Sequence, residues 1–250
     1  YLMIVCNNPG LSVIAFCCLL SVNYCTAQFV EKDTPVNSPD LNFAVNLYSA
    51  TIGENAHLYN GREYFTYDKR IRGNPFFETT TLTAGNISYD GGDYYNIHML
   101  YDITSDEVVI NLYNQNFKIS LLTEKTEKFT FLNHSFYRMA KDSLHGVLLS
   151  AGFYDQLYRG NTTVLVKRRK VVSEKIIYNA NDFSYQNDDH FYIKLDNKYA
   201  EITNKASLFK AFRNKKREVR KYLKKHRIKF KTDPEKAILQ SAKYYDQLRS

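Results

Sequence analysis

The stretch NISYDGGDYYNIHMLYD, residues 86–102, decides the fold class of this chain. Its centre, Asp-Gly-Gly-Asp at residues 90–93, is a strong signal for a tight turn, because such residues accept the positive φ angles of a two-residue hairpin. Tyrosine and β-branched residues flank the turn, and these residue types favour a pleated, half-buried strand. We therefore predict an antiparallel β-hairpin here.

Further short aromatic and β-branched stretches follow, and turn signals separate them about every ten residues. Examples of these signals are Asn-Gln-Asn at 114–116, Arg-Gly-Asn at 159–161 and Asp-Asn at 196–197. No long helical pattern interrupts this series, which argues against parallel βαβ units. We predict a mainly β (α+β) fold, namely an antiparallel β meander, barrel-like or sandwich and closed or nearly closed, with a C-terminal helical cap.

The C-terminal residues are expected to be helical, with a break. A single apolar stripe over residues 208–223 would place Lys215 in its middle. A break at Arg213 and Asn214, with Asn214 as the N-cap, removes this conflict. The next helix is then expected over residues 215–226. Its inward residues would be Val219, Tyr222 and Leu223.

A last helix is predicted to begin after residue 233. Asp233 can cap it, and Pro234 suits the first helical position because that position needs no backbone N–H. Its expected inner face consists of Ile238, Ala242 and Tyr245.

Positive charge is confined to one segment. The chain carries 34 basic and 26 acidic residues, a net charge of +8. Residues 212–231, FRNKKREVRKYLKKHRIKFK, hold eleven basic residues and one Glu, so they contribute +10 and all other residues sum to −2. A nucleic-acid function inferred from the overall pI therefore loses its force. The candidate anion-binding residues are Lys215, Lys216, Arg217, Arg220, Lys221, Lys224, Lys225 and Arg227.

Half of this charge stands at the start of the expected helix, where the macrodipole disfavours cations. That placement suggests a use beyond folding, with lipid headgroups, envelope polysaccharide phosphates or an acidic protein as the expected partner. Nucleic acid is not expected, because an exported protein usually has no access to it. The simpler alternative is a solvated helix face that docks through a narrow Val219/Leu223 seam.

The first residues are expected to be a signal peptide. Residues 11–22 form an apolar run too short to span a bilayer as a helix, and small residues precede a cut after Ala27. The basic start typical of such peptides is lacking, and a transmembrane anchor is the alternative. We expect an exported protein, periplasmic, outer-envelope or secreted, without a transmembrane segment in the mature chain. All four cysteines lie within residues 1–27, so the mature chain would have none.

Four segments follow from these patterns. Residues 1–27 are the predicted signal peptide and 28–41 an extended N-terminal lead-in. Residues 42–203 are the predicted antiparallel β domain, and 204–250 are C-terminal helices packed on it.

Signals for catalysis or metal binding are weak. Asp102, Asp106 and Glu107 surround one predicted turn and offer oxygen ligands for Ca²⁺, but one short turn supplies few of the ~6–8 oxygens required. A solvated turn in which Asp106 satisfies local backbone amides is the simpler interpretation. The six histidines show no zinc-binding spacing, and no Gly-x-Ser-x-Gly or phosphate-loop motif occurs. We expect no catalytic residue, no metal site and no cofactor.

A second basic cluster, residues 167–170 (KRRK), ends a predicted strand. Alternation along the strand would send Lys167 and Arg169 to one face and Arg168 and Lys170 to the other. We expect these cations to protect an edge strand from pairing.

The order of several motifs resembles a group of uncharacterised exported proteins of Bacteroidetes bacteria. The motifs are LYNGREY (58–64), GNPFF (73–77), NISYDGGDYYNIHMLYD (86–102), DEVVI (106–110), GFYDQLYRG (152–160), KRRK (167–170) and the basic segment 212–231. The resemblance covers most of the mature chain. It implies export and a single architecture, and it implies no catalytic residue.

The preferred function is a non-enzymatic exported envelope protein that binds a partner or an anionic surface. One alternative is a carrier that holds a small apolar ligand inside a barrel. Another is a hydrolase whose site is not visible in the sequence, so enzymatic activity stays undecided, with no activity favoured.

Overall fold

The computed structural model describes residues 43, 47, 57–65, 67–112, 117–141, 149–177 and 180–249 of the 250-residue chain. These residues belong to one compact unit that spans Asn37–Ser250. The predicted signal peptide (1–27) and lead-in (28–41) lie outside the described residues.

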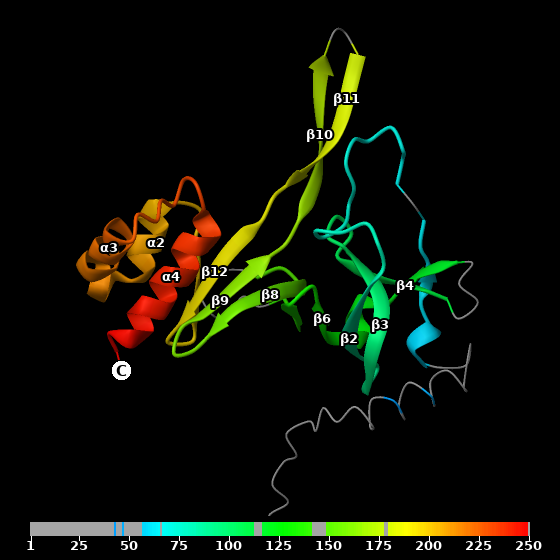
Figure 1. The fold of residues 1–250 in the computed structure, drawn as a ribbon, viewed down its shortest axis with the longest axis horizontal. Coiled ribbons are helices and arrows are strands. Elements are labelled where there is room, and N and C mark those ends of the chain that lie inside the picture. Colours follow the sequence, from blue (N-terminus) through cyan, green and yellow to red (C-terminus); the bar gives the residue numbers. More distant parts are fainter. Residues whose placement is uncertain are drawn as a thin grey trace, which may run out of the picture. The chain divides into compact units, whose positions relative to one another are not determined.

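An antiparallel sheet dominates the fold, as predicted (Figure 1). Within the described residues, eleven strands pair in the order β1-β5-β4-β3-β2-β6-β7-β8-β9-β12-β13. Most neighbours in the sheet are also neighbours in sequence, which is the definition of a meander. The strands are β1 (Arg62–Glu63), β2 (Thr83–Tyr89), β3 (Gly92–Asp102), β4 (Glu107–Asn111), β5 (Lys118–Ser120), β6 (Thr126–Phe131), β7 (His134–Met139), β8 (Gly152–Arg159), β9 (Thr163–Lys167), β12 (His190–Leu195) and β13 (Lys198–Glu201).

The antiparallel meander is confirmed, but the sheet that the described residues form is not closed into a barrel, so the expectation of closure is wrong. Its terminal strands, β1 and β13, each pair with one strand and not with each other among the described residues. Closure requires a consistent stagger over all strands. Here the terminal strands are short, with two residues in β1 and four in β13, so each offers few backbone groups for pairing with the other.

Tight turns of one kind connect three of the hairpins. In each, both turn residues have positive φ, the geometry that matches the right-handed twist of the flanking strands. The pairs are Asp90 (51°) with Gly91 (79°), Leu132 (50°) with Asn133 (64°), and Asp196 (48°) with Asn197 (59°). The predicted turns at residues 90–93 and 196–197 are thus confirmed.

Strands β10 (Lys170–Ile177) and β11 (Ala180–Asn187) form a hairpin that is separate from the large sheet (Figure 1). This hairpin was not predicted from the sequence. The sequence pattern predicted one continuous strand that ends with residues 167–170. Instead β9 ends at Lys167, and the chain changes sheet before Lys170.

Helices follow the sheet, as predicted. They are α2 (Lys205–Ala211), the 3₁₀ turn η4 (Arg213–Lys215), α3 (Lys216–Lys225) and α4 (Pro234–Gln247). The break before α3 is confirmed, but Asn214 is not its N-cap. That position belongs to Lys215, which makes no side-chain cap, because η4 already continues the helical path through Asn214. Asp233 caps α4, with Pro234 at its start, as expected.

The helices pack on the sheet through an apolar seam. Val219 and Leu223 of α3 are buried together with Val164 of β9 and Ile193 of β12. Ile238, Ala242 and Tyr245 of α4 are buried in the same cluster, as predicted, whereas Tyr222 is half-buried. In Figure 1, α2, α3 and α4 lie together beside β9 and β12.

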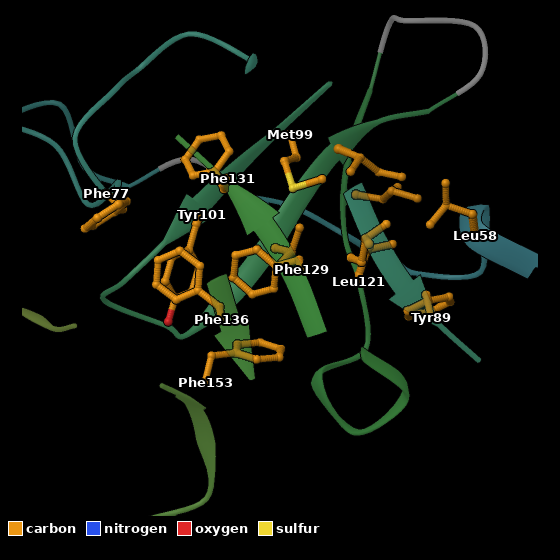
Figure 2. Close-up of a cluster of buried hydrophobic side chains, with 14 of the residues drawn as sticks. Leu58, Phe77, Tyr89, Met99, Tyr101, Leu121, Phe129, Phe131, Phe136 and Phe153 are labelled. Carbon is orange, nitrogen blue, oxygen red and sulfur yellow. The ribbon is translucent and has the colours of Figure 1, made fainter. Parts of the chain in front are cut away.

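A second core is aromatic and lies over the first half of the sheet (Figure 2). Phe129 and Phe136 stack with ring centroids 4.7 Å apart, and Phe153 meets Phe129 edge-on at 5.1 Å. Tyr101 packs edge-on against Phe136 at 4.9 Å. Such close packing of rings fills the interior, so this core gives no support to the ligand-carrier alternative.

Candidate anion-binding site

The candidate cations of the basic segment lie on and beside α3. Lys215, in η4, is half-buried, and the other seven are exposed. None of the eight forms an ion pair with another described residue. Their charges are therefore not neutralised within the part of the chain that the structure describes.

Some cations elsewhere in the chain form ion pairs. The lysines and arginines that form ion pairs among the described residues all lie outside residues 205–247. They are Arg62, Arg70, Arg72, Lys125, Lys167, Arg168, Arg169 and Arg249. Other described cations, such as Lys69, Lys128 and Lys175, also form no ion pair, so the C-terminal segment is distinguished by the density of its unpaired cations and not by the lack of ion pairs alone.

A groove of about 1120 Å³ lies beside α3. Of the predicted residues it brings together Arg220, Lys224 and Arg227. The other five, Lys215, Lys216, Arg217, Lys221 and Lys225, are not part of its lining. Four cations that were not predicted also line it: Lys205, Lys229, Lys231 and Lys236.

The floor of the groove is apolar. Phe209 of α2 and Leu223 of α3 are buried, at 4% exposure each, while Ile228 and Phe230 are half-buried. The last two alternate with basic residues in RIKFK, residues 227–231. The alternation does not reveal the groove, because residues 226–227 and 230–232 form turns and the apolar and basic side chains of this segment line the same groove.

Two cations are held at the groove wall by an aromatic ring. Arg220 lies over Phe209 at 5.1 Å from the ring centroid, and Lys205 lies over the same ring at 5.9 Å. The groove lining contains one carboxylate, Asp233, which accepts a hydrogen bond from the backbone N–H of Lys236 at 2.9 Å as the cap of α4. Cation–π contacts leave a positive charge unneutralised. The groove therefore keeps a strong excess of positive charge.

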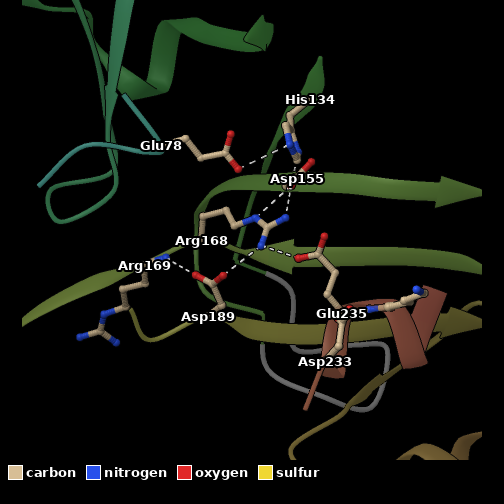
Figure 3. Close-up of polar contacts among 9 residues, drawn as sticks. Glu78, His134, Asp155, Arg168, Arg169, Asp189, Asp233 and Glu235 are labelled. Carbon is tan, nitrogen blue, oxygen red and sulfur yellow. Dashed lines mark hydrogen bonds and ion pairs between the residues drawn. The ribbon is translucent and has the colours of Figure 1, made fainter. Parts of the chain in front are cut away.

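A second cluster of charged residues joins the sheet to α4 (Figure 3). Arg168 is 7% exposed and donates to Asp155 at 2.7 Å, to Asp189 at 2.9 Å and to Glu235 at 2.7 Å. Asp155 also contacts His134 Nδ1 at 2.8 Å. This cluster was not predicted from the sequence. The expectation that residues 167–170 protect an edge strand is wrong for Arg168, because its side chain is buried.

Two members of this cluster, His134 and Arg168, have raised pKa values. Its hydrogen bond to Asp155 raises the pKa of His134. Burial opposes the charge of Arg168, but hydrogen bonds and attraction from Glu235 and Asp155 outweigh it, and the pKa rises. These residues do not line the basic groove. The arrangement is that of a buried ionic link between strands and helix, and it does not provide the open catalytic cleft that the hydrolase alternative needs.

The candidate Ca²⁺ ligand Asp102 is fully buried and is used within the protein. It accepts hydrogen bonds from the Tyr64 hydroxyl at 2.9 Å and from the backbone N–H groups of Thr104 and Ser105 at 2.8 and 3.1 Å. The residue that satisfies the local amides is thus Asp102 and not Asp106.

Asp106 and Glu107 serve other contacts. Asp106 accepts from the Tyr101 hydroxyl at 2.6 Å and from Lys167 Nζ at 2.5 Å, whereas Glu107 pairs with Arg62 at 2.9 Å. Among the described residues, no group of three or more His, Cys, Asp or Glu side chains is placed to hold a metal ion.

Comparisons with known proteins find no matching family model, no similar curated protein and no similar solved structure. Within the described part of the chain, no helix is long and apolar enough to cross a membrane.

Proposed function

We propose that this protein is a non-enzymatic exported envelope protein that binds an anionic surface through α3 and the segments beside it. One observation carries the proposal. Residues 205–231 contain thirteen basic residues and one acidic residue, and none of these cations forms an ion pair among the described residues. Export is part of the proposal and is supported by the signal-like pattern of residues 1–27.

The positive charges of residues 205–231 lie close together. Like charges this close repel one another and lower the stability of the helix that carries them. A negatively charged surface relieves the repulsion and gains roughly 1 kcal/mol for each Lys or Arg near it. Exposed charges are screened beyond a Debye length of about 8 Å at physiological salt, so the attraction weakens as salt rises.

Attachment of the helices to the sheet also favours this function. Val219 and Leu223 face the core, which leaves the opposite side of α3 exposed and basic. A surface that binds by charge needs such a fixed, outward-facing array, because ordering a flexible chain on binding costs free energy. The simpler alternative, a solvated face without a partner, predicts no binding.

Vesicle binding separates the two possibilities. The triple variant Lys216→Glu, Arg220→Glu and Lys224→Glu reverses three exposed cations on α3. We expect its binding to vesicles that contain an anionic lipid to fall by roughly 100-fold or more, since about 1 kcal/mol is lost at each site. Co-sedimentation measures the bound fraction.

The matched control is Lys69→Glu, Lys128→Glu and Lys175→Glu, which makes the same change in net charge at exposed positions outside the C-terminal helices. Its binding should stay close to that of the wild type. Equal losses in both triple variants would show that only net charge matters, and no loss in the α3 variant would overturn the proposal.

A further inference from the structure

We propose that the groove beside α3 binds one single-chain anionic lipid, with its charged head among the groove's cations and its hydrocarbon chain on the apolar floor. This inference rests on the proposed function, because it names the ligand class of the same surface. The inference adds two requirements to the proposed function: a defined pocket and one bound lipid molecule. Binding to an anionic surface requires only charge.

The shape of the groove suits a lipid chain. Its volume of about 1120 Å³ slightly exceeds the ~300–1,000 Å³ typical of small-molecule sites, so it has room for a hydrocarbon chain. Phe209 and Leu223 form a buried base, and Ile228 and Phe230 form a half-buried side. Phe209 and Leu223 are already buried, so a hydrocarbon would gain mainly by covering Ile228 and Phe230, whose partly exposed apolar surface it removes from water.

The charge of the groove suits an anionic head. Seven cations line it, and they come from four segments: Lys205 of α2, Arg220 and Lys224 of α3, residues 227–231 of the connecting loop, and Lys236 of α4. The one acidic residue of the lining, Asp233, is engaged as the cap of α4. Cations that come from several segments can surround a compact head group. An arginine guanidinium can also bind two phosphate oxygens at once.

The cations and the apolar floor together favour an amphiphile as the ligand. A free phosphate would use the cations and leave the partly exposed apolar surface of Ile228 and Phe230 in contact with water. A neutral hydrocarbon would use the floor and leave the cations without partners. An acidic amphipathic helix would need anchors repeated along one line, whereas these cations come from four short segments. A lipid with one chain matches the head and the floor at once.

The first experiment uses the full-length protein and probes that separate head from chain. Isothermal titration calorimetry is performed with lysophosphatidylglycerol below its micelle concentration, with lysophosphatidylcholine of the same chain, and with glycerol phosphate. We expect lysophosphatidylglycerol to bind at one site, lysophosphatidylcholine at least tenfold more weakly, and glycerol phosphate at least 100-fold more weakly. Affinity should rise by up to about three- to fourfold for each methylene added to a short chain.

The second experiment uses variants. Lys229→Glu with Lys231→Glu lies in the loop and should weaken lysophosphatidylglycerol at least tenfold, whereas Lys69→Glu with Lys128→Glu should not. Phe230→Ser should reduce the dependence on chain length. If Phe230→Ser does not fold, the chain-length series on the wild type still tests the floor.

Several outcomes would overturn the inference: equal affinity for glycerol phosphate and lysophosphatidylglycerol, absence of chain-length dependence, or tighter binding of an acidic amphipathic peptide than of any lipid. The proposed function and the groove inference fail under different results. Salt-dependent vesicle binding without one-site lipid binding would remove the groove inference alone, and loss of vesicle binding would remove the proposed function.

Discussion

Arg168 Nη1 lies 2.7 Å from Glu235 Oε2, so the residue directly after β9 is joined to the first turn of α4. The same guanidinium holds Asp155 of β8, which is 1% exposed. The helices that carry the basic surface are therefore attached to the sheet by an ionic link as well as by their apolar seam.

Removal of this arginine should be costly. Arg168→Met leaves the Asp155 carboxylate buried without its main partner, and breaking a buried pair in this way costs about 3–5 kcal/mol. Urea denaturation measures the loss. The neighbouring Arg169, whose ion pair with Asp188 is exposed and 3.7 Å long, is the control. Arg169→Met should cost less than about 1 kcal/mol, and equal costs would contradict the assigned role of Arg168.

His134 should make stability depend on pH. Its folded pKa is raised from 6.5 by the hydrogen bond to Asp155, while Arg168 opposes and Glu78 adds to the shift. Because the folded pKa is raised, the protonated His134 stabilises the fold. This contribution is fully present below about pH 6.5, the pKa of the unfolded chain, and is lost as the pH rises through the pKa of the folded state. The free-energy difference between the wild type and His134→Asn should therefore shrink between pH 5.5 and pH 9. A difference that is constant with pH would contradict the protonated His134–Asp155 pair.

Helix capping gives a local test. The Asn204 side chain accepts from the backbone N–H groups of Ala206 and Ser207 at 2.9 Å each. Asn204→Ala should cost about 1 kcal/mol. Asn214→Ala should cost only a few tenths, because Asn214 lies inside η4 and caps no helix. Thermal unfolding of both variants decides between the two positions, and a larger loss at Asn214 would restore the sequence-based cap.

Gly152 tests the packing between strands. Its φ is 127°, and a Cβ there would collide with the Asp106 carboxylate and with Lys167 Nζ. Gly152→Ala should therefore cost more than Gly91→Ala, since Gly91 has φ 79° but open space around it. We expect about 1–2 kcal/mol at Gly91 from backbone strain alone and a larger loss at Gly152. Similar chemical denaturation midpoints for the two variants would show that the collision is relieved.

Features decided by neighbouring residues could be predicted from the sequence. The turn at Asp90 and Gly91, the turn at residues 196–197, and the start of α4 at Asp233 all depend on local backbone preferences. The inward positions of α3 and α4 follow from helical periodicity.

Features decided by distant residues could not be predicted. Whether the sheet closes depends on stagger accumulated over many strands, which no single turn reveals. Arg168 meets Glu235, 67 positions later in the chain, so the buried link has no local signature. Likewise, the groove gathers Lys205 and Lys236 beside the predicted cations because three helices meet there, although the cations of α3 were visible as a run.

The most direct test of the central claim is the partitioning of the wild-type protein onto vesicles with and without an anionic lipid, over a series of salt concentrations. The account predicts binding to the anionic vesicles that declines steadily as salt rises, and little binding to purely zwitterionic vesicles. Equal binding to both kinds of vesicle, or no binding to anionic vesicles at low salt, would contradict it.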